Sequence, residues 1–253
     1  MSVIPAASSH KRIVIVGAAT GIGAAGARAL HATGWNLALL DIAAGPLAEV
    51  AAETDSIAIT VDAGEPPALA DCLEQAAQAL GGLDAAWSNV GVQVNGAVGD
   101  TTVAELDRCW AINVRAHFVC AQTVFPHLAA AGGGSLLITA SNSGLQTESA
   151  MLAYATTKAA AVALARNLAR DAAPAGIRVN ALCPGYVDTP FNAPIWENFG
   201  GREAFIGQIG QTIPLGRMAG PDDVARQAVF LLSDEASLMT GQTLAIDGGE
   251  LVS

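Results

Sequence analysis

The chain has 253 residues, of which 52% are hydrophobic and 14% charged, a composition that favours one large globular domain with an extensive core. Its formal net charge of -11 argues against nucleic acid and anionic membranes as partners, because both bind basic surfaces. We therefore expect an acidic α/β protein that binds small molecules.

The four cysteines form no Cys-x-x-Cys pair and have no neighbouring histidines at metal-ligand spacing, so we expect reduced core thiols and no metal site. The first nine residues lack a basic segment followed by an apolar one, and no stretch of eighteen apolar residues is free of charge or glycine. These patterns predict a cytoplasmic protein without a membrane span.

A strand, a glycine-rich turn and a helix are predicted at the start of the chain. Residues 12–16 are a short β-branched run, and a small-residue helical pattern continues from residue 21 to about residue 30. The turn between them reads Gly17-Ala18-Ala19-Thr20-Gly21-Ile22-Gly23. Glycines let a backbone approach a pyrophosphate, whose charge meets the free N–H groups of a helix N-terminus. We interpret the turn as a dinucleotide site, with a purely structural turn as the alternative.

An acidic residue follows the second predicted strand. Residues 36–40 end in Asp41, eighteen residues after Gly23, about where a carboxylate would meet the adenosine ribose hydroxyls. A carboxylate there repels a 2′-phosphate, and positions 18, 19, 20, 42 and 43 hold no Arg or Lys. The pattern predicts NAD (NADH), preferred over NADP. Asp41 can also cap the helix that follows.

Strands and helices alternate through the rest of the chain. Further strands are predicted at residues 57–61, 84–88, 135–139, 177–182 and 242–247, and helices at 67–80, 102–131 with a break near 111, and 152–172. This order is typical of a single-domain Rossmann fold, a doubly wound, mostly seven-stranded parallel sheet with helices on both faces. The ligand crevice then lies at the carboxyl ends of the strands, and no linker divides residues 1–253.

Tyr154 and Lys158 lie one turn apart on the same face of the Ala-rich helix predicted at 152–172. A free phenol has a pKa of about 10 and is a poor base at neutral pH, and a nearby cation favours phenolate. The pair therefore suits general acid/base chemistry. An ordinary exposed Tyr/Lys pair is the alternative, and neighbouring motifs decide between them.

Five spaced motifs together resemble the short-chain dehydrogenase/reductase family over essentially the whole chain. They are the turn Gly17-x-x-x-Gly21-x-Gly23, Asn89-Val90-Gly91, Ser141 with Tyr154-x-x-x-Lys158, Pro184-Gly185, and Asp247-Gly248-Gly249. Val16 stands where the family often has Thr, and Val90 where it has Ala, so local bonding at these two positions differs from the family pattern.

The resemblance implies roles for four catalytic residues. Tyr154 would be the general acid/base, Ser141 would hydrogen-bond the same substrate oxygen, and Lys158 would hold the nicotinamide ribose and lower the pKa of the tyrosine. Asn113 would position a water that continues the proton relay. An Asn in a long helix more often bonds its own backbone or faces solvent, which is the alternative for Asn113.

The resemblance also implies a set of cofactor contacts along the strand ends. They are Gly17, Thr20, Gly21, Ile22, Gly23, Asp41, Asp62, Ala63, Asn89, Val90, Gly91, Tyr154, Lys158, Pro184, Gly185, Val187 and Thr189. The carboxylate of Asp62 would face the adenine amino group.

The substrate end has fewer signals. Residues 188–215 are expected to form a lid rich in apolar side chains, which either line a pocket or only pack the lid onto the domain. Candidate substrate contacts are Gln93, Asn95, Ser143, Leu145, Met151 and Trp196, with Ser143 also a competitor for the role of Ser141. No cluster of Arg or Lys lies among them, so we expect a neutral, hydrophobic secondary alcohol or ketone.

The sequence thus predicts an NAD-dependent alcohol dehydrogenase or ketone reductase, with a 3-oxoacyl thioester reductase and a non-catalytic NAD-binding scaffold as alternatives. A lyase or dehalogenase on the same scaffold would more naturally replace Lys158 or alter the glycine turn. By family analogy the helices at 102–131 and 152–172 would pair copies into a homo-oligomer, a dimer or a tetramer.

Overall fold

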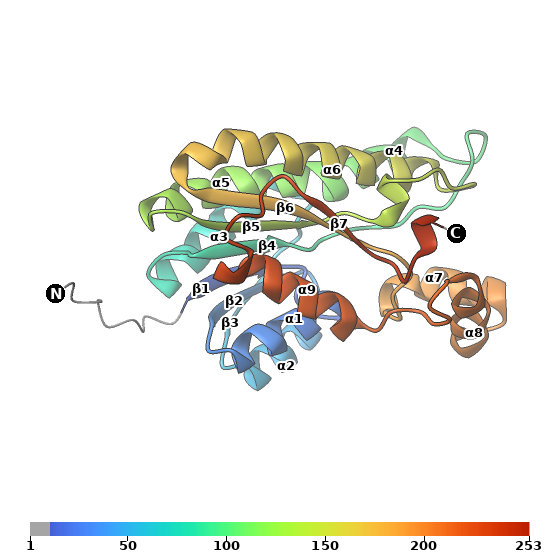
Figure 1. The fold of residues 1–253 in the computed structure, drawn as a ribbon, viewed down its shortest axis with the longest axis horizontal. Helices are drawn as coiled ribbons and strands as arrows, with labels where there is room; N and C mark the ends of the chain where they lie inside the picture. The colour runs from blue at the N-terminus through green and yellow to red at the C-terminus, as the bar shows by residue number, and fades with distance from the viewer. Residues whose placement is uncertain (1–10, 253) are drawn as a thin grey trace.

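In the computed structural model, which describes residues 11–252, seven strands form one parallel sheet in the order β3-β2-β1-β4-β5-β6-β7 (Figure 1). The strands are β1 Arg12–Val16, β2 Asn36–Asp41, β3 Ile57–Thr60, β4 Ala85–Ser88, β5 Gly134–Thr139, β6 Ile177–Pro184 and β7 Thr243–Ile246. The order reverses between β1 and β4, which both pair in parallel with their neighbours. This is the predicted doubly wound Rossmann fold in one domain.

Helices cover both faces of the sheet (Figure 1). They are α1 Gly21–Ala32, α2 Ala44–Glu53, α3 Pro66–Leu80, α4 Val103–Trp110, α5 Ala116–Ala130, α6 Leu152–Ala172, α7 Ala193–Trp196, α8 Arg202–Thr212 and α9 Pro221–Leu232. The short α7 and the adjacent α8 stand beyond the carboxyl end of the sheet, near the C-terminus (Figure 1). Within residues 11–252, none of the helices has the length and apolar character needed to cross a membrane.

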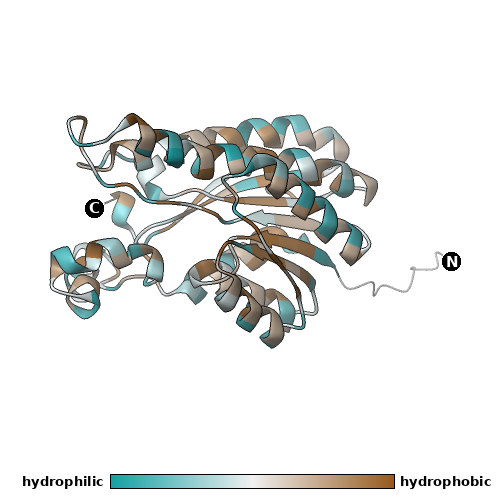
Figure 2. Ribbon diagram, turned by 180° about the vertical axis from the view of Figure 1, so that it is seen from behind, coloured by the Kyte–Doolittle hydropathy of each residue, from teal (hydrophilic) through white to brown (hydrophobic). Residues whose placement is uncertain are grey.

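The two-residue period of the strands divides the core between the two faces. Ile13 and Ile15 of β1 are buried with residues of α1, α2 and α9, whereas Val14 and Val16 are buried with residues of α3, α5 and α6. Figure 2 shows the strands as the most continuously hydrophobic part of the ribbon, with hydrophilic residues on the outward faces of the helices. Such strands, apolar on both sides, are typical of a covered parallel sheet.

The predicted break near residue 111 is confirmed as a π-helical segment, η1, at Ala111–Arg115 between α4 and α5. The helix before it begins with a capping box, in which Thr102 Oγ1 accepts from the Glu105 backbone N–H at 3.2 Å and Glu105 Oε2 accepts from the Thr102 backbone N–H at 2.8 Å. The extra residue of a π-turn rotates the following side chains, and Asn113 is completely buried in it.

The segment after β6 has a small core of its own. Phe205 is fully buried, and Ile195, Ile209 and Met218 pack with it, together with the partly buried Trp196. Most apolar side chains of this segment therefore pack within the segment itself. This differs from both interpretations open from the sequence, which were a pocket lining and packing of the lid onto the domain.

Candidate active site

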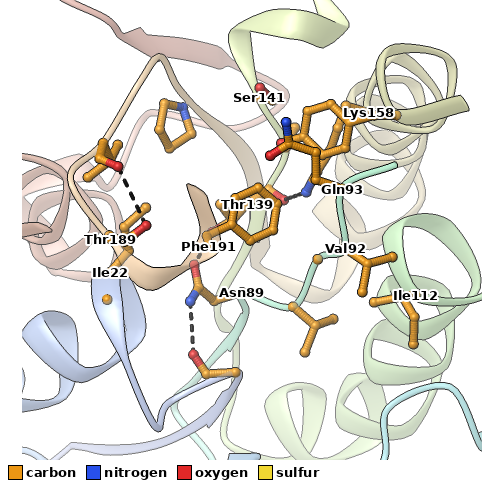
Figure 3. A pocket seen from close by; sticks show the side chains of 18 of the residues that line it. Ile22, Asn89, Val92, Gln93, Ile112, Thr139, Ser141, Lys158, Thr189 and Phe191 are labelled. Atoms are coloured by element: carbon orange, nitrogen blue, oxygen red, sulfur yellow. Dashed lines mark hydrogen bonds between the residues drawn. The ribbon is translucent and has the colours of Figure 1, made fainter. Parts of the chain in front are cut away.

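A cavity of about 530 Å³ lies at the carboxyl ends of the strands. It extends from Asp41 and Asp62, which follow β2 and β3, past the glycine turn to Ser141 and Tyr154. Figure 3 shows Ile22 and Thr189 on one side of it and Val92 and Ile112 on the other. A continuous cavity of this shape suits a two-part ligand such as a dinucleotide.

At Gly17 and Gly23 the glycine turn lies too close to neighbouring backbone for a side chain. A Cβ at Gly23 would lie 1.9 Å from the Gly17 carbonyl oxygen, and one at Gly17 would lie 2.9 Å from the Asn89 oxygen. Gly17 and Gly21 also adopt φ of 87° and 53°, which favours glycine. The open N-terminus of α1 is thereby left accessible to a pyrophosphate, so the turn fits the cofactor that the sequence predicts.

Asn89 links three elements at the base of the cavity. Its Nδ2 donates to the Gly17 carbonyl at 2.9 Å, and its Oδ1 accepts from Thr139 Oγ1 at 2.8 Å (Figure 3). Thr139 in turn accepts from the buried Trp87 Nε1 at 2.9 Å. The network joins β4, β5 and the glycine turn, so it fixes the floor on which a cofactor would lie.

Asp41 closes the far end of the cavity. Its Oδ2 accepts from the Ala19 backbone N–H at 2.9 Å and its Oδ1 from the Ala43 backbone N–H at 3.0 Å. A carboxylate oxygen accepts two hydrogen bonds, so both oxygens keep capacity for ribose hydroxyls. Asp62 accepts from the Gly64 backbone N–H at 2.8 Å and lines the same end.

Tyr154 and Lys158 are both buried on the first turns of α6 and both line the cavity. The Lys158 amine donates to the Thr139 carbonyl at 3.0 Å and lies 5.8 Å from the centre of the Tyr154 ring. Gly91 leaves space for that amine, because a Cβ there would lie 3.1 Å from Lys158 Nζ. Ser141, in the segment that follows β5, completes the group (Figure 3).

The electrostatics of this group differ in one respect from the expectation. Burial raises the pKa of Tyr154, and the hydrogen bond with Ser141 lowers it only in part. Burial also lowers the pKa of Lys158 to about 8. The predicted lowering of the Tyr154 pKa is therefore not found, because the desolvation of the phenolate outweighs the hydrogen bond with Ser141.

Asn113 does not line the cavity. Its side chain binds two segments that do, the 91–92 loop and helix α6. Its Oδ1 accepts from the Val92 N–H at 2.8 Å, and its Nδ2 donates to the Val92 carbonyl at 2.9 Å and to Thr157 Oγ1 at 3.0 Å. These bonds tie η1 to the 91–92 loop and to α6. The side chain is fully buried and bonds other segments. The alternative from the sequence, in which Asn113 bonds its own backbone or faces solvent, is therefore wrong.

Most predicted contacts come together around the cavity. Of the cofactor set, the members that line it are Gly17, Thr20, Gly21, Ile22, Asp41, Asp62, Ala63, Asn89, Val90, Gly91, Tyr154, Lys158, Pro184, Gly185, Val187 and Thr189. Gly23 acts from behind, through its contact with Gly17. Of the substrate set, Gln93, Ser143 and Met151 line the cavity. Asn95, Leu145 and Trp196 do not.

Several residues that line the cavity belong to none of the sequence motifs. Phe191 places its ring 6.1 Å from that of Tyr154, and Tyr186 stacks edge-on against Phe205 at 5.9 Å. Glu148 and Arg108 also line the cavity. The only signal for Glu148 was its place between Ser141 and Tyr154. Among residues 11–252, no group of three or more His, Cys, Asp or Glu is arranged to hold a metal.

Comparisons with known proteins agree with this geometry. The sequence model of the family described as enoyl-(acyl carrier protein) reductase matches residues 17–250. The chain is 32% identical to meso-2,3-butanediol dehydrogenase of Serratia marcescens, over 96% of both chains. It is also 32% identical to NAD-dependent glycerol dehydrogenase of Listeria innocua serovar 6a, over 95% of this chain and 94% of that one. The crystal structure of levodione reductase superposes with a TM-score of 0.91 at 28% identity, over 96% and 98% of the two chains.

Proposed function

The chain belongs to the short-chain dehydrogenase/reductase family of oxidoreductases, and from this premise we propose that it oxidises a secondary alcohol, or reduces the matching ketone, with NAD(H). One observation carries the proposal: Ser141, Tyr154 and Lys158 share one cavity with the glycine turn and Asp41. The reacting carbon and a dinucleotide could therefore be held side by side, which is what alignment for hydride transfer requires.

Tyr154 exchanges the proton in this proposal. As a phenolate it takes the proton of the carbinol during oxidation and becomes the phenol, and the phenol returns that proton to the carbonyl oxygen during reduction, while Ser141 hydrogen-bonds the same oxygen. A nicotinamide held by the glycine turn and Lys158 would supply the hydride chemistry of the reaction. Because burial raises the pKa of Tyr154, its phenolate depends on positive charge nearby.

Lys158 supplies part of that charge. With a pKa of about 8 it stays mostly protonated at neutral pH, and its bond to the Thr139 carbonyl leaves other N–H donors for the nicotinamide ribose. Asn113 serves as a positioning residue, since its bonds to Val92 and Thr157 hold the elements on either side of Lys158. The water-holding role expected from the family resemblance stays a prediction beside this positioning role.

NAD is preferred over NADP in this proposal because of Asp41. Its carboxylate meets the adenosine ribose hydroxyls and repels a 2′-phosphate, and the neighbouring Ile42, 65% exposed, offers no positive charge. A relative named as an NAD-dependent glycerol dehydrogenase supports the same preference.

The substrate we propose is a neutral alcohol or ketone with an apolar part. Phe191 and Met151 give apolar surface next to the reacting oxygen, and the negative charge of Glu148 disfavours anionic substrates. Names of relatives that refer to butanediol and glycerol point to neutral hydroxylated compounds. A 3-oxoacyl thioester on an acidic carrier fits less well, since the net charge of -11 would repel the carrier.

We also propose a cytoplasmic homo-oligomer, a dimer or tetramer. Large apolar side chains are exposed along α4, α5 and α6, namely Trp110, Phe118, Phe125 and Leu152, each at least 41% exposed. The four cysteines are free, as expected in a reducing compartment. Sedimentation of the purified protein tests the assembly, and a monomer at micromolar concentration would contradict it.

The enzyme proposal is tested by fluorescence titration with NADH and NADPH, followed in the same cuvette by aliphatic, cyclic and aryl ketones. Tighter binding of NADH and its consumption with a ketone are expected. Binding without turnover on any of these ketones would favour the non-catalytic scaffold.

A further inference from the structure

Glu148 is a lining residue of the cavity that the proposed proton transfer does not use. Its Oε1 accepts from Gln146 Nε2 at 3.4 Å. Its Oε2 is buried, and no hydrogen-bond donor reaches it within residues 11–252. A buried carboxylate oxygen without a donor is costly, and such an atom in a ligand cavity calls for a donor from the ligand.

The loop that carries Glu148 is held in a fixed and strained shape. Ala150 has φ of 57°, in the left-handed region that non-glycine residues seldom adopt. Its carbonyl accepts from the Gly96 N–H at 2.7 Å, and the Gly96 carbonyl accepts from the Leu152 N–H at 3.3 Å. The 93–96 loop thus keeps the loop in this conformation, and strain of this kind is found at functional sites.

The negative charge of Glu148 affects the pKa of the two tyrosines that line the cavity. Burial is the main cause that raises the pKa of Tyr154, and the negative charge of Glu148 raises it further. The pKa of Tyr186, the other tyrosine of the cavity, is also raised by burial first and by Glu148 next. Glu148, Tyr154 and Ser141 line the same cavity, so one substrate could contact Glu148 while its reacting oxygen is bound to Tyr154.

We propose that the substrate carries a second hydroxyl group, which donates a hydrogen bond to Glu148 while its reacting carbinol is bound by Tyr154 and Ser141. This proposal rests on the proposed function and specifies its substrate as a diol or polyol. A hydroxyl suits the site better than an ammonium, because Lys158 and the oxidised nicotinamide already bring positive charge to this cavity. The nearby neutral lining residues Ser143, Asn142 and Gln93 also match hydroxyl groups.

Matched substrates test the proposal directly. With NAD⁺, kcat/KM is measured for cyclohexanol, 1,2- and 1,4-cyclohexanediol and 2-aminocyclohexanol. The wild type is expected to prefer one of the diols over cyclohexanol by about tenfold or more. Glu148→Ala should reduce that preference about 10- to 100-fold, the range for a hydrogen bond to a charged group. A change in the pKa of Tyr154 in this variant would affect the diol and cyclohexanol alike, so it cancels in the ratio.

Two variants separate hydrogen bonding from charge and from surface effects. Glu148→Gln keeps an acceptor oxygen and should retain most of the preference for the diol. Glu203→Ala removes an exposed carboxylate of α8 and should leave every ratio unchanged.

The contradicting outcomes are distinct. An unchanged diol-to-cyclohexanol ratio in Glu148→Ala, or an equal loss on both, would overturn the contact. A preference for 2-aminocyclohexanol that Glu148→Gln abolishes would show an ammonium as the partner and overturn the diol. Equal use of diol and cyclohexanol by the wild type overturns this inference alone. Oxidation of no alcohol at all overturns the proposed function, and this inference with it.

Discussion

The two ends of the cavity are built by different means. At the cofactor end, the contacts come from strand ends and backbone: the glycine turn touches Asn89, and Asp41 accepts from two backbone N–H groups. At the substrate end, side chains from three loops meet, among them Gln93, Glu148 and Phe191. The first end is fixed by the topology of the sheet, whereas the second can change by loop substitution. Cofactor and chemistry are therefore expected to be more uniform than substrate among proteins of this fold.

The largest effect is expected where the two ends meet, at Tyr154. Tyr154→Phe removes the proton-transfer group, so kcat should fall by about 10³-fold or more while NADH binding and the fold are kept. The protein has only two tyrosines, and both line the cavity, so Tyr186→Phe is a matched control that should change kcat by less than about tenfold. Steady-state rates on the same alcohol compare them. Near-normal turnover by Tyr154→Phe would place the base elsewhere.

The next effect concerns the backbone of the cofactor end. A methyl at Gly23 would overlap the Gly17 carbonyl oxygen, at 1.9 Å, so Gly23→Ala should weaken NADH binding about 100-fold and lower the unfolding free energy by about 2 kcal/mol or more. Gly45 in α2 has no atom within 4 Å of its would-be Cβ, so Gly45→Ala should leave binding unchanged. Fluorescence titration and thermal melting measure both. Normal NADH affinity in Gly23→Ala would remove the turn from the cofactor site.

A smaller effect is expected on cofactor choice. Asp41→Ala removes the repulsion of a 2′-phosphate, and Ile42→Arg adds an attraction, so the NAD-to-NADP ratio of kcat/KM should fall about tenfold in the first variant and further in the double variant. An unchanged ratio in both would mean that Asp41 does not meet the ribose. The substrate preference should stay the same, because these residues lie at the other end of the cavity.

The smallest effect on catalysis is expected at His117, which lies outside both ends. It is fully buried, its Nδ1 is hydrogen-bonded to Ser88 Oγ at 2.6 Å, and burial lowers its pKa to about 3. Above the ordinary pKa of about 6.5 the ring is neutral in both states, and below it only the unfolded chain takes up the proton. Stability is therefore lost progressively as the pH falls from about 6.5 to 3.

Urea unfolding at pH 7, 5.5 and 4.5 tests this prediction against His117→Gln, which cannot titrate. The wild type should lose up to about 1.4 kcal/mol more per pH unit than the variant below pH 6. Equal slopes would mean that the buried ring is charged in the folded protein or does not titrate in the unfolded one.

The cofactor end could be predicted from the sequence because glycines, Asp41 and the Tyr/Lys pair stand at spacings fixed by strands and one helix. The substrate end could not be predicted, because the conformation of a loop decides which of its residues line the cavity. Glu148, on the loop with the strained Ala150, lines the cavity, whereas Trp196 packs against the cluster around Phe205. The pKa of Tyr154 was expected to be lowered, but burial raises it, and burial is a property of the folded chain alone.

Two local features go beyond the elements that the sequence patterns predict. Helix α9 begins with Pro221 at its first position, and Asp223 accepts from the Gly220 backbone N–H at 2.9 Å. Strand β6 runs to Pro184, two residues beyond the predicted end at 182, because its pairing with β7 continues to that residue.

Transfer of an isotopic label tests the central claim most directly. The protein is incubated with NAD⁺ and a secondary alcohol deuterated at the carbinol carbon, and the nicotinamide product is analysed by mass spectrometry and NMR. Deuterium should appear at the nicotinamide ring in the wild type and fall to trace amounts in Tyr154→Phe. Absence of label from the nicotinamide with every alcohol, although NADH binds, would contradict an oxidoreductase and favour a nucleotide-binding scaffold.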